Sequence, residues 1–309
     1  MKVFVSTEDG TIHSSIGNYI RGFTEYRGGF EEIPVGPIDT QMGVAYTVDT
    51  LLLFPNTHII NLWHLMHHLF AAYKSLRGSE STNAFPVFFR NFHKRQGDIT
   101  KCVYNDLIFR GLGLNYEAFL KIYSAFKENK CIEVNRLQVI DTDMNFHDKP
   151  LFQEFRSFVL KNMGVKCDGI KKGSITFILR RDNRKILNIE DVKKNINARF
   201  VFLEDYSIQE QFEIIVNTDV FIGLHGAGLT WAIMMKPGSL LIEIYPGKSN
   251  TDNYSKWCEL ANIRYKRVES QVVEGEEYHF RSCNVVLLPS QLNEIRREVF
   301  DGKQPVPQT

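Results

Sequence analysis

The second half of the chain alternates short apolar runs with amphipathic segments, and this alternation restricts the fold more than any other feature of the sequence. Strands are predicted at residues 174–179, 199–203, 220–224 and 240–245, and helices between them at 189–196, 209–216 and 229–235. Strands that alternate with helices form a parallel sheet covered by helices. The sequence therefore predicts a doubly wound α/β domain, which binds ligands at the carboxyl ends of its strands.

The length of 309 residues favours two domains, because single hydrophobic cores rarely grow beyond about 250–300 residues. Residues 164–173 (Gly-Val-Lys-Cys-Asp-Gly-Ile-Lys-Lys-Gly) break the pattern and have the composition of a linker. We expect an N-terminal domain over residues 1–165 and a C-terminal domain over residues 166–309. The last helix, predicted at residues 291–299, is a candidate for packing back on the first domain.

Charge and composition argue against several classes of partner. The 37 basic and 36 acidic residues give a formal net charge of +1, so no nucleic-acid partner is expected. No run of about 18 apolar residues occurs, so stable membrane insertion is not expected either. The five cysteines are widely spaced without a Cys-x-x-Cys pair, which argues against the common zinc ribbons. Residues 1–10 lack the apolar stretch of a secretory signal, and the sequence as written favours a cytoplasmic location.

The most informative segment is the strand predicted at residues 220–224 together with the run that follows it, His225-Gly226-Ala227-Gly228-Leu229. The two glycines allow the backbone to approach a ligand closely, and the N-terminus of the next helix favours an anion. A diphosphate fits both properties, and the His225 ring could donate a hydrogen bond to it. A tight strand–helix turn without a ligand has the same spacing, so the pattern alone leaves both interpretations open.

A nicotinamide dinucleotide is an alternative ligand for this segment. Gly226 and Gly228 match the first two glycines of the dinucleotide fingerprint, and Glu243 lies in the next predicted strand, where a ribose-binding acid would be expected. However, Trp231 occupies the position of the third glycine, and the predicted helix is shorter than the helix of that unit. An NAD-dependent dehydrogenase is therefore less favoured.

Two arginines follow the strand predicted at residues 174–179. Arg180 lies at its carboxyl end and Arg184 in the loop beyond it. Guanidinium groups bind phosphate oxygens through paired hydrogen bonds, although a solvated basic loop is the simpler explanation of such a cluster. Because parallel strands project their following loops to one side of a sheet, we expect both arginines to lie near His225.

Together these residues resemble glycosyltransferase family 61. The resemblance rests on Arg180-x-x-x-Arg184-x-x-Leu187-Asn188, on Gln211, on Asp219-x-x-x-Gly223-x-His225-Gly226-Ala227-Gly228-Leu229-Thr230 and on Glu243. It is strongest over residues 174–246, and it extends upstream to Asn61-Leu62-Trp63-His64 and to a predicted helix at 151–163. The family includes O-linked N-acetylglucosamine transferases that act on EGF repeats and on dystroglycan, and plant xylan xylosyl- and arabinosyltransferases.

The resemblance implies a GT-B fold, in which two doubly wound Rossmann-like domains face a cleft. It implies an inverting glycosyltransferase that moves N-acetylglucosamine or a pentose from a UDP-sugar to a hydroxyl of a glycoprotein or glycan acceptor, without a metal or other cofactor. The first domain would bind the acceptor and the second the donor. The donor-binding residues implied by the resemblance and the motifs are Arg180, Arg184, Asn188, Gln211, His225, Gly226, Ala227, Gly228, Leu229 and Glu243.

Two features depart from the family. Several animal members have a histidine at the position of Trp231, so a contact on the donor side differs here. Eukaryotic members usually enter the lumen of the ER and Golgi, whereas this sequence shows no signal, which leaves the location open.

Three histidines lie on the helix predicted at residues 60–75. His64 and His68 share a face at a spacing of four residues, and His67 lies beside them. The zinc-protease pattern is absent, because it needs Glu after the first His and Leu65 stands there. Core positions explain His67 and His68. For His64, a structural role and the role of general base toward the acceptor hydroxyl both stay open, since histidine titrates near neutrality.

Two alternatives to this mechanism remain at the level of sequence. An apolar strand is predicted to end in Asp141-Thr142-Asp143, and an Asp-x-Asp pair of this kind can hold a divalent metal on a UDP diphosphate. That metal would replace the helix N-terminus and the arginines as the counter-charge. A chain that keeps the nucleotide site and lacks the base would instead be a non-catalytic nucleotide-binding module.

Overall fold

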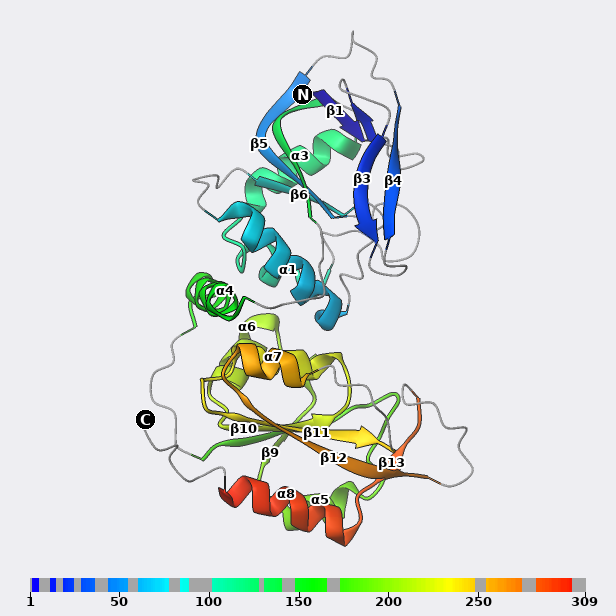
Figure 1. Ribbon diagram of the computed structural model, residues 1–309, viewed down its shortest axis with the longest axis vertical. Coiled ribbons are helices and arrows are strands. Elements are labelled where there is room, and N and C mark those ends of the chain that lie inside the picture. The colour runs from blue at the N-terminus through cyan, green and yellow to red at the C-terminus, as the bar shows by residue number, and fades with distance from the viewer. Residues whose placement is uncertain are drawn as a thin grey trace. The chain divides into compact units, whose positions relative to one another are not determined.

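The computed structural model divides the chain into two units, drawn in Figure 1. The first contains Met1–Phe146 and Ser157–Met163, and the second contains His147–Arg156 and Gly164–Thr309, so that the division runs through helix α4 (Lys149–Asn162). The structure describes residues 2–5, 12–14, 19–24, 29–36, 44–54, 61–77, 84–88, 102–127, 131–140, 148–165, 173–247, 254–273 and 282–301.

Within the described residues, seven strands form the sheet of the first unit, in the order β3-β4-β2-β1-β7-β5-β6. They are β1 (Lys2–Val5), β2 (Ile12–Ser14), β3 (Tyr19–Thr24), β4 (Gly29–Gly36), β5 (Val44–Phe54), β6 (Ala84–Phe88) and β7 (Cys131–Val139). Strands β7, β5 and β6 run parallel, but β1 is antiparallel to β2 and β7, and β3 is antiparallel to β4. The first unit is therefore mixed and not doubly wound throughout, because short consecutive strands can pair without the crossover helix that parallel neighbours need.

The first unit also contains α1 (Leu62–Leu76), α2 (Asn105–Phe109) and α3 (Tyr116–Lys127). The side chain of Asn61 caps α1 by accepting a hydrogen bond from the Trp63 N–H at 3.0 Å. Phe119 of α3 packs against the rings of Phe85 and Phe109, with centroids 5.0 and 4.5 Å away. These aromatic contacts anchor α3 to β6 and α2.

The sheet of the second unit has the order β13-β12-β11-β10-β8-β9, and all neighbours from β9 to β12 run parallel. Its strands are β8 (Ile175–Ile178), β9 (Arg199–Val201), β10 (Val220–Leu224), β11 (Leu240–Pro246), β12 (Arg264–Val272) and β13 (Val285–Val286). Its helices are α5 (Ile189–Asn195), η2 (Leu203–Asp205), α6 (Ile208–Val216), η3 (Ala227–Met234), α7 (Ser255–Leu260) and α8 (Pro289–Asp301). The parallel α/β architecture predicted from the alternation is confirmed in this unit.

Two helices of the second unit, η3 and α8, correspond to the helices predicted at residues 229–235 and 291–299. The helix predicted at residues 229–235 is η3, a 3₁₀ helix that begins two residues earlier. The last helix, α8, packs on β12 and α5 within the second unit, where Lys266 forms ion pairs with Glu294 at 2.8 Å and Glu298 at 3.2 Å. None of the helices in the described part of the chain combines the length and apolarity needed to cross a bilayer.

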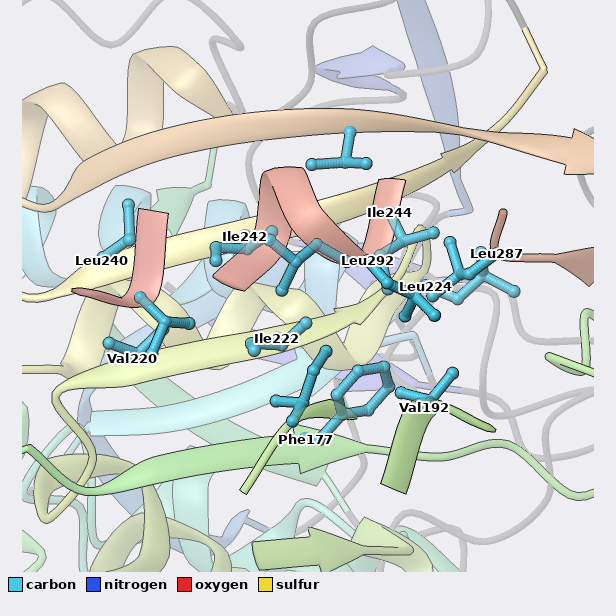
Figure 2. Packing of buried hydrophobic residues seen from close by; sticks show 14 of the residues in the cluster. Phe177, Val192, Val220, Ile222, Leu224, Leu240, Ile242, Ile244, Leu287 and Leu292 are labelled. Carbon is cyan, nitrogen blue, oxygen red and sulfur yellow. The ribbon is translucent and has the colours of Figure 1, made fainter. Parts of the chain in front are cut away.

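The apolar core of the second unit lies on the face of the sheet that α5 and α8 cover (Figures 1 and 2). Its members include Phe177, Val192, Val220, Ile222, Leu240, Ile242, Ile244 and Leu292. Successive side chains of a strand point to opposite faces of the sheet, so Gly223 and Glu243 lie on the other face. Gly223 and Glu243 therefore lie on the face of the sheet that α6, η3 and α7 cover (Figure 1).

Leu240→Ala should lower the free energy of unfolding of the second unit by about 2–5 kcal/mol, because it leaves a cavity in a packed core. Leu240 is 2% exposed, whereas Leu187 is 52% exposed. The matched change Leu187→Ala should cost roughly 0.5 kcal/mol or less. Urea denaturation measures both variants, and equal destabilisation would contradict the position of this core.

Candidate functional site

The order of the strands creates a switch point between β8 and β10. The chain passes from β8 out to the edge strand β9 and then returns to β10, on the other side of β8. The loops that follow β8 and β10 therefore start side by side and lead in opposite directions, which is where open parallel sheets bind ligands. They are the loops that carry Arg180 and His225, and the structure brings them together as the sequence predicted.

Arg180 and Arg184 converge on Gly226. A Cβ atom placed on Gly226 would overlap Arg180 Nη1 and would lie 3.4 Å from both Nη1 and Nη2 of Arg184. Arg184 Nη1 also donates a hydrogen bond to the His225 carbonyl oxygen at 2.6 Å. Two guanidinium groups thus flank the glycine backbone, and the missing side chain of Gly226 leaves room for them.

The environment of Arg180 is suited to an anion. Burial lowers the pKa of the Arg180 guanidinium from its ordinary value, and the charge of Glu204 acts in the opposite direction. The hydrogen bonds of Arg180 go to the backbone and side-chain oxygens of Asn183, at 3.2 and 2.9 Å, and both acceptors are neutral. Because arginine keeps its proton in proteins, a bound anion would supply the negative charge that these contacts lack.

The loop that carries the two arginines is held at both ends. Arg181 forms a bidentate pair with Asp205, with both N–O distances at 2.6 Å. Asn188 exchanges two hydrogen bonds with the backbone of Leu287, at 2.8 and 3.0 Å. Arg184 has a φ angle of 53°, a left-handed conformation that a non-glycine residue keeps only where its surroundings hold it. The guanidinium groups are therefore prearranged. The donor-binding role expected of Asn188 stays a prediction.

His225 is buried, and its ring is fixed on several sides. Nδ1 donates a hydrogen bond to the carboxylate of Glu243. The ring centroids of Tyr245 and Tyr254 lie 4.7 and 5.9 Å from that of His225. Because Glu243 occupies Nδ1, Nε2 is the ring nitrogen through which His225 can reach a ligand.

Glu243 is a carboxylate in the middle of the sheet with an exposed fraction of 1%. In register it lies opposite Gly223 of β10 and Arg267 of β12. The Tyr265 hydroxyl donates a hydrogen bond to Oε2, while His225 occupies Oε1, so each carboxylate oxygen has a donor. Such partners offset the large cost of burying a charge. The ribose-binding role predicted for Glu243 stays a prediction.

Sequence reasoning missed Tyr254, which precedes α7. Its hydroxyl donates a hydrogen bond to the Gly226 carbonyl oxygen at 2.7 Å. Burial, followed by the charge of Glu243, raises the pKa of Tyr254 above its ordinary range, so the hydroxyl stays a neutral donor. No local pattern could have found Tyr254, because it lies 28 residues after Gly226 and meets it only through the fold.

The glycine motif leads directly into η3. Ala227 and Gly228 are partly exposed at its N-terminus, whereas Leu229 is fully buried. At the other end, the guanidinium of Arg156 donates hydrogen bonds to the carbonyl oxygens of residues 233–235. A cation at the C-terminal end complements the helix dipole, and the N-terminal end remains suited to an anion.

Comparison with known proteins identifies the family. The sequence profile described as Glycosyltransferase 61 matches residues 62–242, which is more than half of the chain. The chain belongs to glycosyltransferase family 61. It is 33% identical over 129 residues to the EGF domain-specific O-linked N-acetylglucosamine transferase of Gallus gallus, covering 38% of this chain and 23% of that protein.

Two further relatives match a segment of similar length. The transferase of the same name from Canis lupus familiaris is 34% identical over 125 residues, covering 37% of this chain and 23% of the relative. Protein O-linked-mannose beta-1,4-N-acetylglucosaminyltransferase 2 of Mus musculus is 26% identical over 119 residues, covering 36% and 20%. The matched segments thus span less than a quarter of the length of these curated relatives.

The structure gives Trp231 a structural role. It is 1% exposed and packs against Phe212, with ring centroids 4.7 Å apart. Its Nε1 donates to Gln211 Oε1 at 2.9 Å, and Gln211 Nε2 donates to the carbonyl oxygens of Leu203 and Tyr206 at 2.9 and 3.0 Å. Gln211 therefore ties α6 to η2 and η3, and its predicted contact with the donor stays a prediction.

The family 61 resemblance also selected His64, which the structure places half-buried on α1 in the first unit. His67 and His68 are each 1% exposed. His67 Nδ1 donates to the Trp63 carbonyl oxygen at 2.8 Å, and His68 packs edge-on against Phe54. The core positions expected for His67 and His68 are confirmed, and the catalytic role of His64 stays a prediction.

The alternative Asp-x-Asp site lies outside the described residues, since both Asp141 and Asp143 fall in the segment 141–147. Within the part of the chain that the structure describes, no three His, Cys, Asp or Glu side chains gather as a metal site requires.

Gly226→Ala should weaken binding of inorganic pyrophosphate about tenfold or more, because the added methyl group displaces the guanidinium of Arg180. Thermal unfolding should change little, since the φ of 164° at Gly226 is extended backbone that any residue adopts and the displaced arginine is flexible. Isothermal titration and thermal denaturation measure the two effects. Unchanged affinity for pyrophosphate would exclude Arg180 from the site.

Proposed function

We propose that this family 61 member is an inverting glycosyltransferase that moves a sugar from a UDP-sugar to a hydroxyl of a protein or glycan. The observation that carries the proposal is the convergence of Arg180 and Arg184 on Gly226 at the switch point of a parallel sheet. The names of the relatives specify N-acetylglucosamine as the transferred group, which supports that sugar, with a pentose as the second choice from the family resemblance.

In this proposal the diphosphate of the donor binds at Gly226–Gly228. Arg180, Arg184, His225 and the N-terminus of η3 would stabilise the negative charge that grows on the departing UDP. Because the loops are held before a ligand arrives, little reorganisation is needed when that charge develops. These groups supply the counter-charge that a divalent metal provides in other enzymes, so we propose a reaction without a metal.

The transfer itself needs one base. The acceptor oxygen attacks the anomeric carbon from the side opposite to UDP, the bond between that carbon and the diphosphate oxygen breaks, and the electron pair leaves with UDP. The base takes the proton of the acceptor hydroxyl, and the configuration of the sugar inverts. We propose His64 as this base, because histidine titrates near the operating pH and His64 lies in the segment of α1 that the family profile includes.

We further propose a GT-B arrangement, in which the first unit binds the acceptor and the second binds the donor. The doubly wound second unit supports this proposal, as does a family profile that extends from α1 in the first unit to β11 in the second.

A panel of UDP-sugars tests the proposed function. The true donor should raise the melting temperature and be consumed when an acceptor is added. A non-catalytic module would bind the donor without consuming it, and no response to any UDP-sugar would refute the proposal.

His64→Ala should lower the rate of transfer about 100- to 10,000-fold and leave the affinity for UDP nearly unchanged, because only the transition state uses the base. Arg180→Ala should instead weaken UDP binding roughly tenfold or more. Calorimetry with UDP and initial rates of transfer separate the two variants. If His64→Ala loses UDP binding, or transfers at a near-normal rate, another residue of the first unit is the base.

Transfer should continue in excess EDTA, because the arginines and the N-terminus of η3 provide the positive charge at the diphosphate. Initial rates with and without EDTA, and after addition of manganese, measure this. Loss of transfer in EDTA that manganese restores would reverse the prediction and favour Asp141 and Asp143 as metal ligands.

A further inference from the structure

We infer that Glu243 and Tyr265 are positioning residues that act on the bound diphosphate through His225, and that Glu243 does not itself contact the donor ribose. The inference rests on the proposed function, since it concerns how the same site holds its anion. It replaces the ribose-binding role that the sequence predicted for Glu243, which lies in the middle of β11.

The burial of Glu243 is the first reason. A residue that binds ribose hydroxyls must present a carboxylate oxygen to the ligand, but Glu243 is 1% exposed. Its two carboxylate oxygens are directed at protein donors, Oε1 at His225 Nδ1 and Oε2 at the Tyr265 hydroxyl. Breaking either contact to reach a ribose would leave a buried polar group without its partner, which is costly.

The position of His225 is the second reason. His225 immediately precedes Gly226, where Arg180 and Arg184 converge, and the His225 carbonyl oxygen accepts a hydrogen bond from Arg184. The residue is therefore part of the wall that the anion would meet. Its Nδ1 faces Glu243, so a contact with the anion must use Nε2.

The charge of Glu243 is the third reason. Nε2 can donate a hydrogen bond to a phosphate oxygen when the ring carries protons on both nitrogens, and the Glu243 carboxylate balances the resulting positive charge. A carboxylate that orients a histidine by accepting its Nδ1–H is a recurrent device in enzyme sites. The Tyr265 hydroxyl keeps the carboxylate in place, and the rings of Tyr245 and Tyr254 limit rotation of the imidazole.

A double-mutant cycle measured with two probes tests the inference. The variants are Glu243→Gln, His225→Ala and their combination, and the probes are UDP and inorganic pyrophosphate, which lacks a ribose. Glu243→Gln should weaken both probes by the same factor, about tenfold, because the charge-assisted contact through His225 is lost for both. In the His225→Ala background the same change should alter either affinity less than about twofold, since residues that act through one another are not additive.

Two further variants and a measurement of folding test whether a loss of affinity comes from misfolding. Tyr265→Phe removes one hydroxyl and should weaken both probes a few-fold, again only when His225 is present. Glu294→Gln changes a half-buried carboxylate in the ion pair with Lys266 on the opposite face of the sheet and should leave both affinities unchanged. Thermal denaturation of each variant establishes that it is folded at the temperature of titration.

Three results would overturn the inference. Glu243→Gln could weaken UDP and leave pyrophosphate unaffected, which would mean a direct ribose contact. The loss of affinity caused by Glu243→Gln could be as large in the His225→Ala background as in the wild-type chain. Nitrogen-15 NMR of the ligand-free chain, with the His225 signals assigned by their loss in His225→Ala, could find Nδ1 without a proton. The NMR result is independent of any ligand, so it separates this inference from the proposed function, which falls if the wild-type chain binds neither UDP nor pyrophosphate.

Discussion

The carboxylate of Glu243 is buried within a sheet whose other face packs against the apolar core, and the surrounding residues are arranged to keep that charge hydrogen-bonded. His225 reaches it from the end of the neighbouring strand β10, and Tyr265 reaches it from β12 on the other side. Since a buried charge without partners costs several kcal/mol, these positions depend on one another. The orientation of the His225 ring, and with it the nitrogen that faces a ligand, follows from this constraint.

In the sheet of the second unit, one face carries the apolar core and the other carries the candidate site. Under α5 and α8, aliphatic residues such as Ile222 and Ile242 pack into the core that holds the sheet together. On the opposite face, Gly223 removes a side chain beside Glu243, and a Cβ atom there would overlap Ile178. A parallel register then brings the ends of β8 and β10 to one edge. The residues that stabilise the sheet are therefore different from the residues of the candidate site.

Elements with a clear hydrophobic pattern were predicted from the sequence, and elements without one were missed. Strand β10 agrees with its predicted bounds, because five apolar residues between polar neighbours allow few alternatives. Strand β12 escaped prediction, since Arg264–Val272 carries charges on a partly exposed strand. The type of η3 was also missed: its residues are buried almost all round, so no amphipathic period distinguishes the 3₁₀ form. In the first unit, β1 pairs with β2 and β3 with β4 as antiparallel neighbours, and the strand–helix alternation that revealed the second unit does not reveal pairs of this kind.

For this protein the sequence by itself determined the parallel α/β class of the second unit, the family, and the residues that gather at the switch point, because period and glycine spacing are local properties of a chain. Only the tertiary structure decided what those residues do. Arg180 and Arg184 meet at Gly226, Gln211 supports Trp231, and Asn188 binds the backbone of Leu287. Tyr254 and Tyr265 join the site from more distant parts of the chain. Partners of buried polar groups are chosen by the packing of the whole unit, and no spacing along the sequence encodes them.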